Sequence, residues 1–236
     1  MTNITPQIAE LLGAHIGDGT FYRTHSSLVW ELRGALEEKD YYFKTICPLL
    51  KDIFNLEIQS KFRSGGAHGC WGIQTTRREI INLLLDFGFT PGTKTFTVFV
   101  PNYIFNSSLD IKRAFLRGLF DTDGCLRFDR LKKQVLYTYP KIEFCSASLA
   151  LRDYTVKLLS EVGFSCYTWQ FKTYYSLCIA GKAQLEKWII EIKPGNPKHL
   201  KKYHLWKENG FYFKEALATV AQPGTAQTEQ ILAYDC

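Results

Sequence analysis

The residues best placed for chemistry are two aspartates that each precede a glycine inside a repeated segment. Leu11–Gly19 reads LLGAHIGDG and Leu116–Gly124 reads LRGLFDTDG, so that Asp18 and Asp123 stand 105 residues apart. Carboxylate oxygens are the ligands that hard divalent cations such as Mg²⁺ prefer. If the two acids meet at helix ends, their mutual repulsion and the helix dipoles favour a bound cation. Two such cations can support hydrolysis of a phosphodiester.

Each aspartate follows an apolar segment with helical periodicity. The first helix is predicted over Pro6–Gly17, with Thr5 as its N-cap, and the second over Asp110–Thr122. Small residues four apart mark one stripe on each helix: Gly13 with Gly17, and Gly118 with Thr122. Such stripes let two helix backbones approach closely, so we expect these helices to pack together with Asp18 and Asp123 side by side. The glycines that follow the two acids, Gly19 and Gly124, are expected to end the helices in the left-handed conformation.

The rest of the chain repeats in the same order at a similar shift. The second predicted helices are 39–54 and 149–162, and the third are 77–87 and 182–192. Strand-like segments lie between them, at 21–32, 56–62 and 71–75 in the first copy and at 126–144, 165–171 and 174–179 in the second. This order predicts an α+β fold of two αββαββα repeats with antiparallel sheets. We expect the first repeat over 1–90, a linker over 91–108, the second repeat with a basic terminal helix over 109–213, and a polar tail over 214–236.

Composition narrows the class of protein without naming a function. The 236 residues are 46% hydrophobic, which is ample for a packed core, and the chain lacks an apolar run long enough to cross a membrane. Seven cysteines without zinc-type spacing favour reduced thiols in a cytoplasm or organellar matrix. The net charge of +6 lies wholly after residue 100, which points to a polyanionic partner contacted by the second copy.

At the two nine-residue segments the chain resembles the LAGLIDADG homing endonucleases in their single-chain, two-motif form. The connector GTKTFTVFVP (92–101) and the ending NPKHLKKYHLWKENGF (196–211) extend the resemblance. It implies two pseudo-symmetric halves whose sheets form a DNA-binding saddle, with the motif helices packed at the centre. It also implies a site-specific endonuclease that makes a staggered cut in a long, non-palindromic double-stranded target. Mg²⁺ would be the cofactor, Mn²⁺ would substitute, and Ca²⁺ would bind without supporting cleavage.

Carried over residue by residue, the resemblance makes Asp18 and Asp123 the metal-binding acids, with the carbonyls of Gly17 and Thr122 as further ligands. The family often adds a basic residue in each half to order the waters around the metals. Lys94 and Lys198 follow the two acids at nearly equal distances and are the candidates, with Lys201 as an alternative to Lys198. Each lysine could also be an ordinary surface residue.

The chain departs from the family at two places. Many members carry Gln or Lys just after the second strand, whereas the corresponding stretches here read RGALEE (33–38) and EFCSAS (143–148). The sixth motif position is Ile16 in one copy and Asp121 in the other, and we expect Asp121 to order the elbow rather than bind metal. Of the histidines, His15 is expected to be packed and His199 to lie on the surface.

Strands of such a saddle can lie along the major groove with alternate side chains turned towards the bases. Candidate DNA contacts in the first half are Arg23, His25, Arg33, Arg63 and Gln74. Those in the second half are Arg127, Lys132, Lys133, Lys141, Gln170, Lys172, Lys201 and Lys202. Because strand residues alternate between two faces, about half of such a set should face away from DNA.

Two other interpretations stay open at this point. One is a nucleic-acid-binding protein on the same scaffold without cleavage, either an RNA maturase that binds intron RNA or a DNA-binding regulator. The other is an unrelated α+β protein that happens to be duplicated. We expect a monomer, because both halves lie in one chain, and a free-standing, intron-encoded protein, because intein splice-junction residues do not flank the segment.

Overall fold

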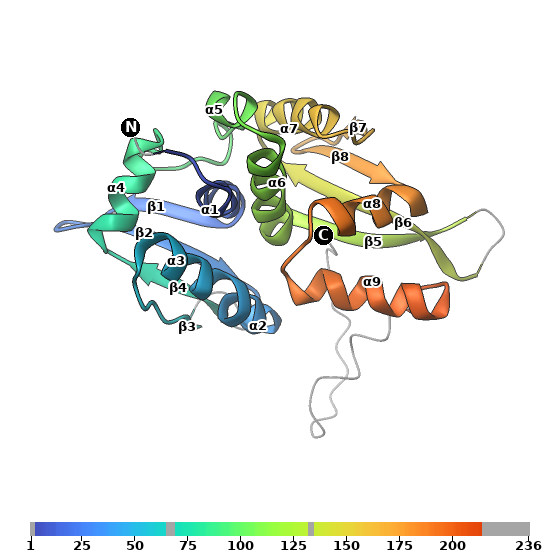
Figure 1. Ribbon diagram of the computed structural model, residues 1–236, viewed down its shortest axis with the longest axis horizontal. Coiled ribbons are helices and arrows are strands. Elements are labelled where there is room, and N and C mark those ends of the chain that lie inside the picture. Colours follow the sequence, from blue (N-terminus) through green and yellow to red (C-terminus); the bar gives the residue numbers. More distant parts are fainter. Residues whose placement is uncertain (1–2, 65–68, 132–134, 214–236) are drawn as a thin grey trace, which may run out of the picture.

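The computed structural model describes residues 3–64, 69–131 and 135–213, and these form two similar halves (Figure 1). The first half contains α1 (Pro6–Gly17), β1 (Gly19–Arg23), β2 (Leu28–Gly34), η1 (Leu36–Glu38), α2 (Lys39–Tyr41), η2 (Tyr42–Ile46), α3 (Cys47–Phe54), β3 (Lys61–Arg63), β4 (Cys70–Thr75) and α4 (Arg78–Asp86). After α5 (Asn102–Phe105), the second half contains α6 (Leu109–Asp123), β5 (Gly124–Arg130), β6 (Tyr137–Ser146), α7 (Leu149–Glu161), β7 (Tyr167–Gln170), β8 (Tyr175–Ala180), α8 (Lys182–Glu191) and α9 (Pro197–Asn209). The predicted α+β fold with two repeats is confirmed.

Each half has one four-stranded antiparallel sheet, in the order β1-β2-β4-β3 or β5-β6-β8-β7. Paired residues share a face of a sheet, so the register separates the helix-facing side chains from the others. In the first sheet Leu32 pairs with Ile73 and both are fully buried, whereas Glu31 pairs with Gln74 on the opposite face. We call the faces turned away from the helices the outer faces.

The two motif helices stand next to each other between the sheets (Figure 1). A Cβ added at Gly13 would collide with the carbonyl of Phe115, and one at Gly118 with the carbonyl of Glu10. Only glycine therefore permits this backbone approach, as the small-residue stripes predicted.

The prediction for Gly19 and Gly124 is wrong. Neither is among the glycines with positive φ, and Gly124 is extended, with φ −86° and ψ 159°. Both begin a strand directly after the helix, and each is needed for space, because a Cβ would strike His15 or Phe120 respectively.

Two hydrophobic clusters hold the halves together, one beneath each sheet. The first centres on Trp30, Leu50 and Leu84, and the second on Phe120, Ile179 and Trp188, all of them at most 1% exposed. Each motif helix contributes to the cluster of its own half, while Ala9 and Ile16 of α1 belong to the second cluster. The halves therefore share their innermost packing.

The helix predicted over 39–54 is present but opens into a π-turn, η2, before α3. Pro48, in the first turn of α3, lacks a backbone N–H and its ring would meet the carbonyl four residues earlier in a regular helix. A wider turn at 42–46 relieves that conflict.

The domain limits at 90, 108 and 213 stay predictions. The tail after residue 213 lies outside the described residues. In the part of the chain that the structure describes, every helix is too short or too polar to cross a membrane.

Candidate metal-dependent nuclease site

The two aspartates of the motifs meet at one end of the central helices. Asp18 is the C-cap of α1 and Asp123 is the last residue of α6. Both line a hollow of about 640 Å³ that is open to solvent between the halves, together with Gly17 and Lys94. A Cβ built at Gly17 would lie 3.3 Å from Cβ of Asp123, which shows how closely the ends approach.

The surroundings of these acids disfavour their charged forms. Burial and, to a smaller extent, the nearby carboxylates of Asp123 and Glu38 raise the pKa of Asp18 to about 7, against the opposing charges of Lys94 and Lys198. Surrounding protein also raises the pKa of Asp123, against the attraction of Lys94. Two buried carboxyl groups at helix C-termini, of which Asp123 raises the pKa of Asp18, form a site at which a cation would be stabilised.

Lys94 places its ammonium group at this site. Nζ donates a hydrogen bond of 2.6 Å to the carbonyl oxygen of Gly17 and a second one to that of Ile16. Burial lowers the pKa of Lys94, whereas Asp123 and Asp18 raise it. The structure thus brings Lys94 close to both acids. The carbonyl of Gly17, which the resemblance implied as a metal ligand, is the hydrogen-bond acceptor of Lys94 here.

Lys198 is not among the residues that line the hollow, but its charge acts on Asp18. It is half-buried in the first turn of α9, where its backbone N–H donates to Oδ1 of Asn196 at 3.0 Å, and its charge lowers the pKa of Asp18. Lys198 is not among the charges that shift the pKa of Asp123, whereas Lys94 is. Lys94 thus acts on both acids and Lys198 on Asp18, and the role of either lysine in ordering water stays a prediction.

The residues present suit a hard divalent cation. Asp18, Asp123 and the carbonyl of Gly17 offer only oxygen atoms as ligands. The Gly17 carbonyl already accepts a hydrogen bond from the ammonium group of Lys94, so it faces a positive charge in this structure. The hydroxyl of Thr122 donates back into α6, to the carbonyl of Gly118 at 3.0 Å, so only its carbonyl could serve a metal. Within the described residues, no group of three or more His, Cys, Asp or Glu side chains is placed to hold a metal. Two carboxylates leave coordination positions for water and phosphate, as Mg²⁺ sites usually do.

Two residues that sequence reasoning missed shape the site. Glu38, in the RGALEE stretch, is buried, and its charge acts on Asp18. Asn196 is fully buried and donates from Nδ2 to Oε1 of Glu38 at 2.8 Å and to the carbonyl of Asp121 at 2.7 Å. Asn196 directly before Pro197 is a recognisable N-cap signal for α9. No sequence pattern shows that the Asn196 side chain also contacts Glu38 in the other half.

Asp121 does not order its own elbow in the way we expected. Its Oδ2 accepts a hydrogen bond of 2.7 Å from the backbone N–H of Gly195, just before α9. Burial raises the pKa of this fully enclosed carboxyl group to about 8, although the bonds from Gly195 and Asn196 favour its charged form. The acid at the sixth motif position thus holds the segment that carries Lys198.

On the outer face of the first sheet, predicted DNA contacts join into one polar chain. Arg63 donates to Oε1 of Gln74, Gln74 donates to the hydroxyl of Tyr22 at 2.9 Å, and that hydroxyl donates to Glu31 at 3.0 Å. Arg33 pairs with the same Glu31 at 2.7 Å. The residues lie on all four strands and present donors and acceptors together.

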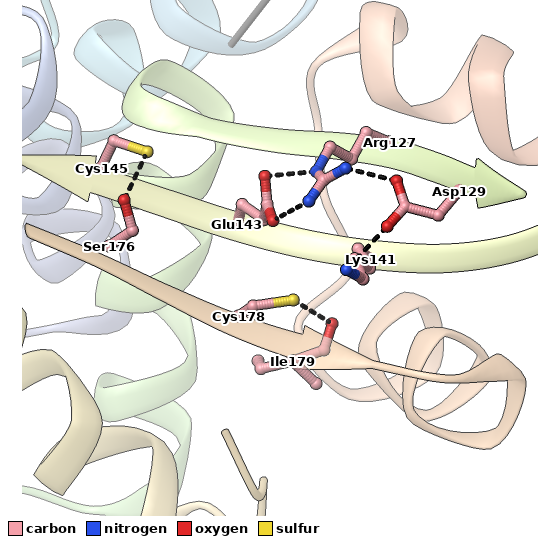
Figure 2. Close-up of polar contacts among 8 residues, drawn as sticks. All are labelled: Arg127, Asp129, Lys141, Glu143, Cys145, Ser176, Cys178 and Ile179. Carbon is pink, nitrogen blue, oxygen red and sulfur yellow. Dashed lines mark hydrogen bonds and ion pairs between the residues drawn. The ribbon is translucent and has the colours of Figure 1, made fainter. Parts of the chain in front are cut away.

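The outer face of the second sheet carries a tighter charge cluster (Figure 2). Arg127 binds both carboxylate oxygens of Glu143, at 2.5 and 2.6 Å, and also contacts Asp129. Lys141 contacts the other oxygen of Asp129 at 2.7 Å. Two cations and two anions thus neutralise each other, whereas sequence reasoning treated Arg127 and Lys141 as available for DNA.

The remaining candidates are scattered. Arg23 and His25 are exposed at the end of β1 and in the turn after it, Lys172 is exposed in the turn between β7 and β8, and Lys201 is exposed on α9. Gln170 is exposed but its register places it on the helix side of the sheet, and Lys202 borders the hollow over the second sheet. Lys132 and Lys133 lie outside the described residues.

His15 and His199 are both buried, as expected for His15 and contrary to expectation for His199. His15 accepts a hydrogen bond from Nε1 of Trp30 at 3.2 Å, and the His199 ring packs 4.3 Å from that of Phe120. Burial lowers the pKa of each to about 3. His199 therefore belongs to the packing between α9 and α6.

Comparison with known proteins finds one matching domain and several solved structures with a similar fold. Residues 110–193 match the model of the LAGLIDADG-like domain. The structure is similar to that of I-DmoI in complex with DNA and Mn, with a TM-score of 0.55 and 17% identity over 80% of this chain and 97% of that one. It is also similar to that of the LAGLIDADG meganuclease I-AabMI bound to uncleaved DNA, with a TM-score of 0.55 and 14% identity over 92% of this chain and 96% of that one.

Curated relatives are matched over a small part of their length. A glutamine--fructose-6-phosphate aminotransferase of Methanocaldococcus jannaschii is 30% identical over 131 residues, which are 52% of this chain and 10% of that protein. The chain spans between a tenth and a fifth of the length of the curated relatives it matches.

The chain has two similar halves, and the second contains the segment that matches the LAGLIDADG-like domain. The resemblance to the LAGLIDADG homing endonucleases, in their single-chain form with two motifs, is confirmed by the matched domain and the shared fold.

Proposed function

We propose that the protein is a site-specific DNA endonuclease that makes a staggered double-strand break in a long, non-palindromic target. The observation that carries this proposal is the meeting of Asp18 and Asp123 in one solvent-open hollow between two sheets. Two reactive positions in one hollow suit two phosphodiester bonds on opposite strands. The similar structures I-DmoI and I-AabMI, both bound to DNA, support a duplex as the partner.

The residues would divide the work between binding and chemistry. The outer faces hold the duplex so that its scissile phosphates enter the hollow. Asp18, Asp123 and the carbonyls of Gly17 and Thr122 would hold divalent ions, which when bound supply an activated water and stabilise the leaving oxygen. Lys94, which lines the hollow, and Lys198, whose charge acts on Asp18, would stabilise the negative charge that increases on the phosphate during cleavage.

Residues of this chain also support an asymmetric target, a preference among divalent ions and a compartment. The outer faces of the two sheets differ in residue type, which supports a non-palindromic target read by a monomer. Oxygen-only ligands favour Mg²⁺ with Mn²⁺ as a substitute, whereas Ca²⁺ would bind without cleavage. Seven cysteines without zinc-type spacing support a reducing compartment, the cytoplasm or an organellar matrix.

The test is selection of a target from a library of randomised duplexes by cleavage in Mg²⁺, followed by sequencing of both ends. We expect one asymmetric site with two offset cuts, and binding without cutting in Ca²⁺. Binding of duplex without cleavage in any divalent metal would contradict the proposal and favour a regulator. Preference for a folded intron RNA would favour a maturase.

A further inference from the structure

The outer hairpin of the second half carries a row of aromatic side chains, three exposed and one, Trp169, half-buried. We call Tyr167, Trp169, Phe171 and Tyr174 the aromatic row. Tyr167 is 46% exposed, Phe171 48% and Tyr174 37%. Tyr167 and Trp169 lie on the outer face of β7, because they pair in register with Cys178 and Ser176, while Phe171 and Tyr174 form the turn to β8.

The row is not part of the core. Leu177 and Ile179 of the core cluster point to the opposite face, and they alternate with Ser176 and Cys178, which are also buried but lie on the same face as the row. The matching hairpin of the first half carries Lys61, Arg63 and Gln74 on its outer face instead. The fold therefore does not require aromatic side chains at this position, and large exposed apolar patches indicate a binding surface.

The row is continuous with the site. It lines a hollow of about 830 Å³ that also includes Arg127, Glu143 and Cys145. Cys145 lines the hollow of Asp18 and Asp123 as well. A duplex whose phosphates reach the two aspartates would therefore extend over this outer face towards the row.

The polar groups along this path bind each other. Arg127 and Lys141 are neutralised by Glu143 and Asp129, as Figure 2 shows. These four side chains pair with one another in the floor of the hollow, and Lys202 adds positive charge at its border. The aromatic row is the main apolar feature of the lining.

The rings of the row pack partly on one another. Phe171 and Tyr174 stack at 4.6 Å and 27°, and the Trp169 and Phe171 rings meet in a T-shaped contact at 6.4 Å. Phe171 still has 48% of its surface exposed. The bases of a duplex are stacked on one another, and the apolar group that its major groove offers to such a surface is the C5-methyl of thymine.

We propose that the aromatic row reads thymine methyl groups in the outer arm of the target held by the second half. The first half reads its arm by hydrogen bonds from the polar chain around Arg63 and Gln74. This inference rests on the proposed endonuclease function, and the two arms of one target are thus recognised by different chemistry.

The test uses the full-length protein and the duplex recovered from the randomised library. Affinity is measured in Ca²⁺ with each thymine replaced in turn by deoxyuridine, which removes only the methyl. We expect a loss of about fourfold for each methyl contacted, in one arm alone. Phe171→Ser should lower affinity for the thymine duplex and abolish the difference between thymine and deoxyuridine.

The matched control is Phe62→Ser. Phe62 is 57% exposed on β3, the strand equivalent to β7, but its register places it on the helix side of its sheet. It should leave the methyl effect intact. Arg63→Ala should relax base preference at the opposite end of the target from Phe171→Ser.

Each alternative result overturns the inference in a different way. Equal affinity for thymine and deoxyuridine duplexes, with binding otherwise normal, would overturn the thymine assignment and leave the endonuclease function intact. Tighter binding of single-stranded DNA or RNA that depends on Phe171 would show a stacking surface instead. Failure to bind any duplex would overturn both the inference and the proposed function.

Discussion

Asn196 donates a hydrogen bond of 2.8 Å from Nδ2 to Oε1 of Glu38, which lies 158 residues earlier in the chain and in the other half. The same amide group donates to the carbonyl of Asp121 in α6, and Oδ1 accepts from the backbone of Lys198 in α9. One buried side chain therefore ties together the first half, the second motif helix and the helix that carries a site lysine.

Replacement of Asn196 by alanine should destabilise the protein strongly. The variant leaves the Glu38 carboxylate and the Asp121 carbonyl without this donor, and it removes the N-cap of α9. We expect a loss of about 3 kcal/mol in the free energy of unfolding, measured by denaturant unfolding. The control is Asn209→Ala in the same helix, where an exposed amide donates to Leu205 at 2.8 Å, and which should cost well under 1 kcal/mol. Equal losses for the two variants would show that the bond to Glu38 contributes little.

The glycines between the motif helices should not tolerate even a methyl group. Gly13→Ala and Gly118→Ala place a Cβ against a backbone carbonyl, so each should cost about 1–3 kcal/mol or force the helices apart. Gly88→Ala is the comparison, because no atom lies within 4 Å and only its φ of +84° disfavours alanine, for about 1 kcal/mol. Thermal unfolding of the variants provides the measurement. Wild-type stability in Gly118→Ala would contradict the close approach.

Buried His199 should make stability depend on pH in the acid range. Its folded pKa is lowered to about 3 whereas an unfolded histidine titrates near 6.5, so the unfolded state binds the extra proton between these values. Stability from this group is complete above about pH 6.5 and is lost as pH falls towards 3. From pH 7 to pH 5 the loss is about 2 kcal/mol.

The measurement compares wild type with His199→Gln across that range by denaturant unfolding. The slope of unfolding free energy against pH should be smaller in the variant by about one proton. Because Asp121 and the other acids titrate in both proteins, the difference isolates His199. Parallel curves would mean that His199 is charged or exposed in the folded protein.

Lys94→Met should impair cleavage more than binding. The variant removes the one ammonium group that donates to the Gly17 carbonyl beside both aspartates, and the loss of such a group typically slows catalysis about 10²-fold to 10³-fold. Single-turnover cleavage of the selected duplex and affinity in Ca²⁺ are the readouts. Lys44→Met, which removes an exposed lysine paired with Asp40, should change neither.

Most of the fold could be predicted from the sequence because local signals agree with the tertiary structure. Proline and threonine mark the start of α1, and the prediction for this helix matches its observed limits. The glycine stripe predicted the central helix pair, and the pair in turn brings Asp18 and Asp123 to one hollow. These features are periodic or repeated, so a single chain reveals them.

What could not be predicted depends on contacts between distant parts of the chain. His199 looked like a surface residue of a basic helix, yet α9 packs against α6 and buries it. Glu38, whose charge acts on Asp18, is held by the backbone N–H of Ala35 in its own half and by Asn196 in the other. Arg127 was read as a DNA contact because its partner carboxylates lie on another strand or two residues away on its own. No local pattern encodes such pairings.

The central claim is that Asp18 and Asp123 together form the cleavage site, and strand cleavage by their asparagine variants tests it most directly. Supercoiled plasmid with the selected target is incubated in Mg²⁺ with wild type, Asp18→Asn or Asp123→Asn, and binding is measured separately in Ca²⁺. We expect linear product with wild type only, and affinity in both variants within about tenfold of wild type, since phosphate contacts dominate binding. Double-strand cutting at the wild-type rate by either variant would contradict the account.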